Sequence, residues 1–203
     1  MSRHIKIWSF VDRDRSGKVR WTANELGYDI VEVRVKPGEH TSDSYRQLNP
    51  YEQIPTSELD GKMMIESTAI CLSLAEREPQ AGLIPGDQDT RDLFWQSIFL
   101  SANTLEMPVV LYWLSNRGVV DAAWKDMWAP HINKRLGVFA AGVPGEGFIC
   151  GAFSLADICA AYVLRIAVQA ELVPLEGKLE GYLRRLMARP AAQAARFFDS
   201  LEA

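Results

Sequence analysis

Short apolar runs separated by charged residues fill the first third of the chain. Residues 28–35, YDIVEVRV, set apolar side chains between acidic and basic ones, which is the pattern of a half-buried strand. Residues 4–10 also have strand character. Between them, residues 17–27 follow a helical pattern that stops at Gly27, a residue type favoured at helix C-termini. The chain is therefore expected to begin with a strand, a helix and a second strand.

A hairpin is predicted next. Its turn is Asp60-Gly61, a dipeptide favoured in two-residue hairpin loops. The predicted elements after the second strand are, in order, a short helix at 44–48, strands at 56–59 and 62–65, and a helix at 67–77. The order β-α-β-α-β-β-α predicts a small α/β domain at residues 1–78.

The second part of the chain has only helical patterns. It follows residues 78–89, which are rich in Pro and Gly and are typical of a linker. The predicted helices are 90–115, 121–139, 155–170, 175–188 and 190–201. Ser154 and Asp157 have the spacing of a capping box, with Asp in place of the usual Glu. An all-helical domain is therefore expected at residues 89–203.

Composition limits the functional classes. The net charge of −4, without any run of Lys or Arg, argues against a nucleic-acid-binding surface. The N-terminus lacks the pattern of a signal peptide, and the longest apolar runs are too short to cross a bilayer. Three cysteines without C-x-x-C spacing favour a reducing compartment, so a cytoplasmic protein is expected. The histidines have no partners at metal-ligand spacing, so no metal is expected.

Three stretches carry a resemblance to the glutathione transferase family that extends over the chain. They are LNPYEQIPTSELDGKMMIESTAICLSLAE, FSLADICAA and YLRRLMARPAAQAA. The closest match in type is to bacterial, cytosolic, serine-type (theta-like) members. The resemblance implies a thioredoxin-like N-terminal domain that holds glutathione, an all-α helical-bundle domain that covers the second substrate, and a homodimer.

The resemblance also implies which residues hold glutathione. A proline that precedes a strand can follow a cis bond, and Ile54-Pro55 is expected to do so. The backbone of Ile54 would then pair with the cysteine of glutathione, as a strand pairs with a sheet edge. Glu66 suits the α-ammonium of the γ-glutamyl group, and Ser67 suits its carboxylate at a helix N-terminus. The alternative is that Ser67 only caps the helix and Glu66 is solvated.

Other candidates follow from positions that serve the same role in the family. His40 and Gln53 match positions that hold the glycine carboxylate of glutathione. A lone loop histidine can equally be solvated. Asn103 is a polar candidate on the first long helix of the second domain, from which family members reach across the dimer.

The thiol-activating residue is the point where this sequence departs from the family pattern. Aligning residues 19–21 puts Arg13 where several members have the activating serine, and Arg15 where others have cysteine. The hydroxyl left at the helix start is that of Ser16, which is the candidate donor to the glutathione sulfur, and Arg13 or Arg15 is expected to add positive potential there. The alternative is that Ser16 only caps the helix.

The function expected is a glutathione transferase that joins the thiolate of glutathione to a small apolar electrophile. Met107 and Trp113 are candidates for lining its pocket. Two alternatives stay open. One is a catalytically weak glutathione-binding module that sequesters ligands or docks a partner, and the other is a glutathione-dependent isomerase or dehalogenase on the same fold.

Overall fold

The computed structural model describes residues 3–10 and 14–201. The chain divides into two compact units, and their ranges do not follow the sequence order strictly. Unit 1 comprises residues 1–82 and 190–197, and unit 2 comprises residues 83–189 and 198–203. The ranges expected from the sequence, 1–78 and 89–203, did not include this return of the chain to unit 1.

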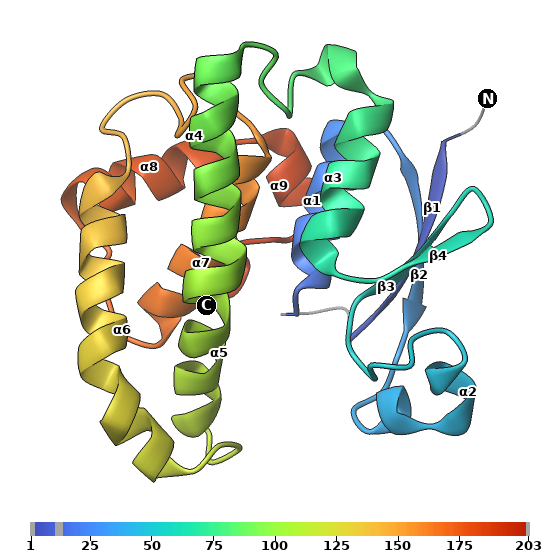
Figure 1. The fold of residues 1–203 in the computed structure, drawn as a ribbon, viewed down its shortest axis with the longest axis horizontal. Coiled ribbons are helices and arrows are strands. Elements are labelled where there is room, and N and C mark those ends of the chain that lie inside the picture. Colours follow the sequence, from blue (N-terminus) through green and yellow to red (C-terminus); the bar gives the residue numbers. More distant parts are fainter. Residues whose placement is uncertain (1–2, 11–13, 202–203) are drawn as a thin grey trace. The chain divides into compact units, whose positions relative to one another are not determined.

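Unit 1 has the predicted βαβαββα order (Figure 1). Its elements are β1 (His4–Ser9), α1 (Ser16–Glu25), β2 (Asp29–Arg34), the 3₁₀ turn η1 (Glu39–Thr41), α2 (Asp43–Arg46), β3 (Thr56–Leu59), β4 (Lys62–Met64), α3 (Ser67–Arg77) and the 3₁₀ turn η2 (Pro79–Ala81). The four strands lie in the order β2-β1-β3-β4, with β1 parallel to β2 and antiparallel to β3. This confirms the predicted thioredoxin-like domain.

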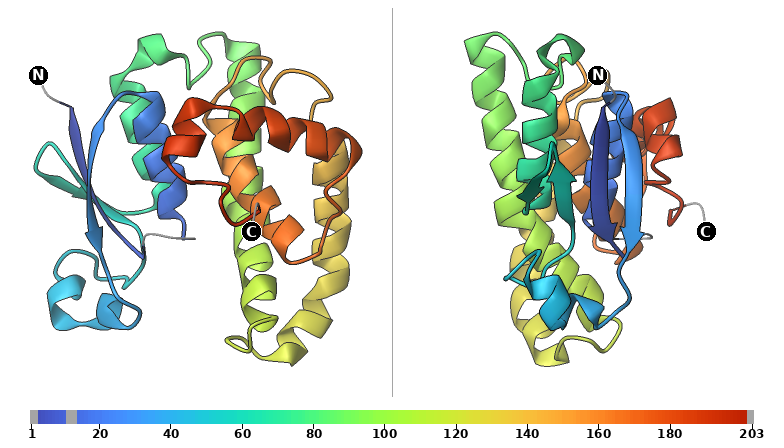
Figure 2. Two further views of the ribbon diagram at one scale, coloured as in Figure 1. Left: turned by 180° about the vertical axis from the view of Figure 1, so that it is seen from behind. Right: turned by 90° about the vertical axis from the view of Figure 1, so that its right-hand side faces the viewer.

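The helices α1 and α3 pack together on one face of this sheet (Figure 2). The strand β1 supplies the centre of the core, because Ile5 and Ile7 are completely buried. The hairpin turns on Asp60 and Gly61, both with positive φ, as a type I′ turn requires. The predicted two-residue turn is therefore confirmed.

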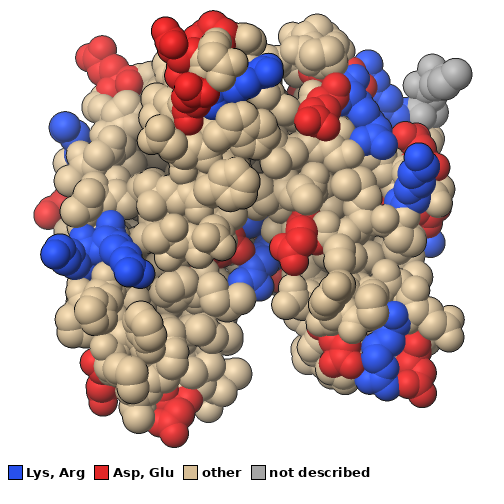
Figure 3. Space-filling view, in the orientation of Figure 1, with Lys and Arg blue, Asp and Glu red and all other residues tan. Residues whose placement is uncertain are grey.

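Exposed hydrogen bonds and ion pairs of Arg46 stabilise α2 and the chain on either side of it. Arg46 donates to the carbonyl of Thr41 at 2.7 Å, to Asp43 at 2.5 Å and to Glu52 at 2.9 Å. Figure 3 shows this arrangement as a basic side chain between acidic ones over α2. Each exposed ion pair contributes little by itself. Together, the bonds of Arg46 join Thr41 and Asp43, at the start of the segment, to Glu52, which lies closer to β3.

The last helix, α9 (Pro190–Ala194), belongs to unit 1. It is shorter than the predicted helix 190–201, because the chain turns after it and Arg196 has a positive φ of 53°. That turn buries Phe197 against Trp21 of α1, with 4.8 Å between ring centroids. Gly17 leaves room for the ring, since a Cβ there would lie 3.2 Å from Phe197.

Unit 2 is all-helical, as predicted. Its elements are α4 (Gln88–Phe99), the π-helix η3 (Leu100–Leu105), α5 (Glu106–Ser115), α6 (Ala122–Gly142), α7 (Leu155–Gln169) and α8 (Gly177–Met187). The first three of these run on from one another over the range of the single predicted helix 90–115. The central helix is α7, whose residues are all buried from Leu155 to Ala167.

The predicted capping box at the start of α7 is confirmed. The Asp157 carboxylate accepts from the backbone N–H of Ser154 at 2.9 Å, and both halves of the box are present. It also accepts from the N–H of Ile149 at 2.9 Å and from the hydroxyl of Tyr182 at 2.8 Å. Burial nevertheless raises the pKa of the Asp157 carboxyl above its ordinary value. Burial also raises the pKa of the Tyr182 phenol well above its ordinary value, and the nearby Asp157 carboxylate raises it further.

Candidate functional site

The candidate site lies at one end of the sheet of unit 1. The register of β1 and β3 pairs Trp8 with Thr56, and one further step places Ser9 opposite Pro55. The register of β3 and β4, extended in the same way, places Pro55 opposite Glu66. The start of β3, the end of β1 and the start of α3 therefore meet at the same end of the sheet.

The bond between Ile54 and Pro55 is cis, as predicted. The side chain of Ile54 is 8% exposed and packs in a small cluster with Trp8, Val35 and Tyr45. The ladder between β1 and β3 starts at Thr56, so Ile54 precedes it. The side chain of Ile54 thus faces the core, and its backbone is the part available to a ligand.

The start of α3 presents polar groups. Glu66 is exposed and has φ 66° and ψ 104°, a backbone conformation that side-chain-bearing residues rarely adopt and that clusters at functional sites. Its side chain does not cap α3. The N–H groups of the first turn have no intrahelical partners, and the Ser67 hydroxyl has no hydrogen-bond partner among the described residues. An anionic group is the ligand that such a helix start favours.

The start of α1 is capped by a carboxylate that the sequence interpretation did not single out. Asp14 accepts from the N–H of Phe10 at 2.6 Å and from the N–H of Ser16 at 2.5 Å. It thereby joins the end of β1 to the first residue of α1. Arg15 precedes the helix and is partly exposed. Arg13, the third candidate for thiol activation, lies outside the described residues.

The hydroxyl of Ser16 is part of an internal network. It accepts from Arg20 at 2.7 Å, and the same nitrogen of Arg20 lies 2.6 Å from the carboxylate of Glu32. Ser9 at the end of β1 donates to that carboxylate at 2.6 Å. The bond from Arg20 leaves the Ser16 proton unused, but Ser16 is 0% exposed, so contact between its hydroxyl and a ligand would require the surrounding side chains to move. The role of Ser16 as sulfur donor stays a prediction under this condition.

Two further candidates lie on the loops at this end of the sheet. The ring of His40 contacts Phe10 edge-on at 5.3 Å between centroids, and its Nδ1 is buried without a hydrogen-bond partner in the described structure. The side chain of Gln53 is exposed, while its backbone carbonyl is held by two donors from the segment before it. Both positions can supply a polar group to a ligand that extends from Ile54.

The candidates in unit 2 are described separately. Asn103 lies on η3 and is exposed. Met107 is 44% exposed. The ring of Trp113 is covered by the guanidinium of Arg117 at 3.6 Å, and its indole nitrogen is buried without a partner in the described structure.

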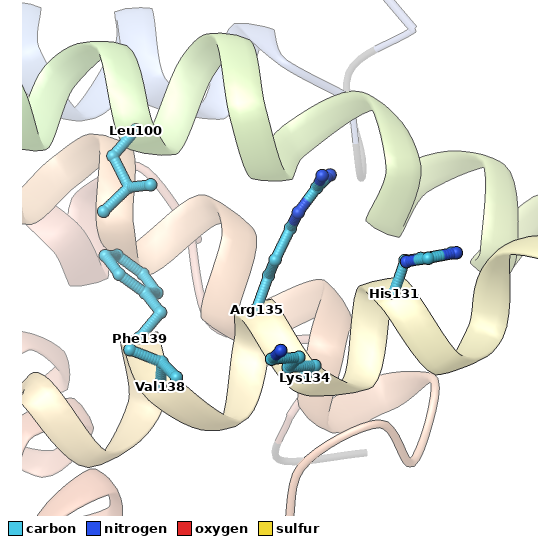
Figure 4. A pocket seen from close by; sticks show the side chains of 6 residues that line it. All are labelled: Leu100, His131, Lys134, Arg135, Val138 and Phe139. Carbon is cyan, nitrogen blue, oxygen red and sulfur yellow. The ribbon is translucent and has the colours of Figure 1, made fainter.

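A groove of about 390 Å³ does lie within unit 2 (Figure 4). It runs between the start of η3 and the middle of α6 and combines apolar with basic side chains. The lining residues are Leu100, His131, Lys134, Arg135, Val138 and Phe139. Basic side chains over α6 are also visible in Figure 3. Two apolar members are well exposed, Leu100 at 41% and Val138 at 72%.

No group of three or more His, Cys, Asp or Glu side chains within residues 3–10 and 14–201 is arranged to hold a metal ion. Within the same ranges, every helix is too short or too polar to span a bilayer.

Comparison with known proteins gives a consistent family. Residues 15–82 match the model of the glutathione S-transferase N-terminal domain. Over 89 residues the chain is 37% identical to "Probable maleylacetoacetate isomerase 2" of Drosophila melanogaster, covering 42% of this chain and 39% of that protein. "Probable maleylacetoacetate isomerase 1" of the same species is 28% identical over 77% of this chain and 66% of its own length. These curated relatives are thus matched over less than two thirds of their length.

Solved structures extend the likeness to both units. The theta class glutathione S-transferase of Xanthomonas axonopodis pv. citri, with glutathione bound, superposes with a TM-score of 0.79. That match covers 95% of this chain and 97% of the other at 22% identity. An identity this low shows the shared fold, and residue roles have to be argued from the site itself.

Proposed function

Because residues 15–82 match the glutathione S-transferase N-terminal domain, we propose that the chain is a member of that family, that it binds glutathione at the end of the sheet in unit 1 and that it uses the thiolate of glutathione against a small electrophile. The observation that carries the proposal is the meeting of Ile54-Pro55 with Glu66-Ser67 at one end of the hairpin. Peptide-like groups and a charged amino-acid end are the two parts of glutathione, and these four residues offer a partner to each.

The fit can be followed group by group. The Ile54 backbone offers an N–H and a C=O to the cysteine residue of glutathione, as in strand addition. Glu66 offers a carboxylate to the α-ammonium, and the start of α3 with Ser67 offers donors to the α-carboxylate. The buried Nδ1 of His40 and the exposed side chain of Gln53 are available for the glycine carboxylate. The three cysteines are thiols rather than disulfides, which agrees with a reducing, cytoplasmic setting.

The reaction is nucleophilic addition or substitution by sulfur. A free thiol with a pKa near 8.5 is only slightly ionised at neutral pH, so the site has to favour the thiolate. Arg15 and the positive end of α1 supply favourable potential at the end of β1. In conjugation the sulfur forms a bond to an electrophilic carbon, and the leaving group departs or a double bond accepts a proton.

A second candidate function is supported by the maleylacetoacetate isomerase relatives. Isomerisation starts with the same step, addition of the thiolate to a conjugated double bond. Rotation about the resulting single bond and loss of the thiolate then return glutathione unchanged. The two functions therefore differ in whether glutathione is consumed.

The test combines binding with stoichiometry. Calorimetry with glutathione establishes binding, and chlorodinitrobenzene or a maleyl diacid serves as the acceptor. We expect one glutathione to be lost per conjugate formed. Turnover of the maleyl diacid with glutathione conserved would favour the isomerase. Binding without turnover of either acceptor would favour the ligand-sequestering module, and absence of glutathione binding would refute the proposal.

A further inference from the structure

A closed ring of side-chain hydrogen bonds surrounds Ile54-Pro55. The hydroxyl of Tyr45 donates to the backbone carbonyl of Gln53 at 2.9 Å, and the amide nitrogen of Asn49 donates to the same carbonyl at 2.9 Å. Both side chains also reach the hydroxyl of Thr56, Tyr45 at 2.8 Å and Asn49 at 3.2 Å. The residue before Ile54 and the residue after Pro55 are thus held by the same pair of side chains.

Counting protons fixes the direction of each bond in the ring. Tyr45 has one hydroxyl proton and gives it to Gln53, so its oxygen accepts from Thr56. The two amide protons of Asn49 go to Gln53 and Thr56. Its amide oxygen accepts from the N–H of Tyr51 at 3.0 Å, which fixes the amide orientation. Every donor and acceptor in the ring has a partner.

The ring is buried. Tyr45 is 4% exposed, Asn49 is 1% exposed and Thr56 is 0% exposed. Hydrogen bonds in such surroundings are stronger than in water, and a missing partner is costly. Burial also raises the pKa of the Tyr45 phenol, so that it keeps its proton and remains a donor at neutral pH.

We propose that Tyr45 and Asn49 are positioning residues for glutathione binding, and that they act by fixing the backbone of Ile54. The proposal rests on the proposed function. The side chain of Ile54 packs in the cluster with Tyr45, and the ring holds the carbonyl of the peptide group before Ile54 and the side-chain hydroxyl of Thr56 after Pro55. The orientation of the Ile54 N–H and C=O is therefore set before a ligand arrives. Neither Tyr45 nor Asn49 touches the ligand in this role.

The experiment measures the binding of two ligands to the unsubstituted protein, to two variants of the ring and to one control variant. Tyr45→Phe removes a single oxygen from the ring, and Tyr51→Phe is the matched control because that tyrosine is 70% exposed and only its backbone touches the ring. The ligands are glutathione and an analogue with an ester oxygen in place of the cysteine N–H. The analogue cannot donate to the carbonyl of Ile54 but keeps the γ-glutamyl end.

We expect Tyr45→Phe to weaken glutathione binding by about fivefold, the range of one ordinary hydrogen bond, and to weaken binding of the ester analogue much less. Thr56→Val, which keeps the side-chain shape but removes the hydroxyl, is expected to give the same pattern. Tyr51→Phe is expected to leave both affinities unchanged.

Other outcomes would contradict either the positioning role or the proposed function. Equal weakening for both ligands would show a general structural role and overturn the positioning role, as would unchanged affinities in Tyr45→Phe and Thr56→Val. If the unsubstituted protein binds the analogue and glutathione equally, Ile54 does not pair with the cysteine, and the inference fails while glutathione binding stands. If the unsubstituted protein binds neither, the proposed function itself fails.

Discussion

Glu66 is the residue whose replacement tests the γ-glutamyl end of the site most directly. We expect Glu66→Ala to weaken glutathione binding by about tenfold to a hundredfold, because a hydrogen bond to a charged group contributes about 1.5–3 kcal/mol. The fold should be preserved, since Glu66 is exposed and does not cap α3. Calorimetry measures the affinity. Glu76→Ala, at an exposed position of the same helix, is the control and should bind normally.

An unchanged affinity in Glu66→Ala would remove this residue from the site. An equal loss in the Glu76→Ala control would point to charge at long range rather than to a contact.

The thiol provides a second test at the scale of single residues. We expect Arg15→Gln to raise the pKa of bound glutathione thiol more than Ser16→Ala does, because Arg15 is partly exposed whereas the Ser16 side chain is completely buried inside unit 1. The thiolate absorbance in the ultraviolet, followed against pH, gives each value. One pKa unit corresponds to about 1.4 kcal/mol of lost thiolate stabilisation. A larger rise in Ser16→Ala would instead identify its hydroxyl as the sulfur donor.

The sequence allowed some of these residues to be predicted because their signals are local. A proline before a strand, and an acid and a hydroxyl at a helix start, are neighbours in the chain. Tyr45 and Asn49 were missed because their partners are determined by how residues 43–56 fold back on β3. Asp14 had a usable signal, since an acid just before a helix is a favoured capping residue, but it stands in a run of charges.

At the scale of elements, the start of α7 makes a prediction about pH. Because burial raises the pKa of Asp157, the folded state binds a proton on this group more readily than the unfolded state. The group's contribution to stability is therefore largest below its unfolded pKa of about 3.9 and is lost as pH rises through the folded value. Asp157→Asn cannot titrate.

We therefore expect the difference in unfolding free energy between the unsubstituted protein and Asp157→Asn to grow as pH is lowered from neutral to about 4. Urea unfolding at a series of pH values measures it. Asp126→Asn, at an exposed position of α6, should show no such trend. A difference that shrinks toward low pH would mean that Asp157 is stabilised as the carboxylate.

The elements themselves differ in how readily they could be predicted. The capping box and the hairpin turn are sequence motifs, and the structure confirms both. The early end of α9 depends on the packing of Phe197 against Trp21, in the space that Gly17 leaves open. That contact joins residues far apart in the chain, so no local sequence pattern predicts it.

For the whole molecule, we propose the homodimer that the family resemblance implies. The exposed apolar side chains of Leu100 and Val138, which line the groove of unit 2, are candidates for the dimer interface. We expect the unsubstituted protein to have a dimer mass by light scattering at micromolar concentration, and Val138→Glu to shift it toward the monomer. Burying an unpaired carboxylate in an interface is costly, whereas at an exposed position it costs little.

Val119→Glu is the control, because Val119 is equally an exposed valine, at 68%, outside the groove. A monomer mass for the unsubstituted protein would refute the dimer. A dimer that survives Val138→Glu would place the interface elsewhere.

The return of residues 190–197 to unit 1 matters for anyone who exchanges parts between relatives. A hybrid gene joined once, near residue 82, would combine an N-terminal unit from one parent with a mismatched Phe197 segment from the other. Three crossover points are needed, the second close to Arg189 and the third after Phe197, because residues 198–203 belong to unit 2 again. The same arrangement has a consequence on the ribosome, where the first eighty-two residues emerge long before the segment that covers Trp21. Until that segment is synthesised, the nascent N-terminal unit exposes an aromatic surface that a chaperone could recognise.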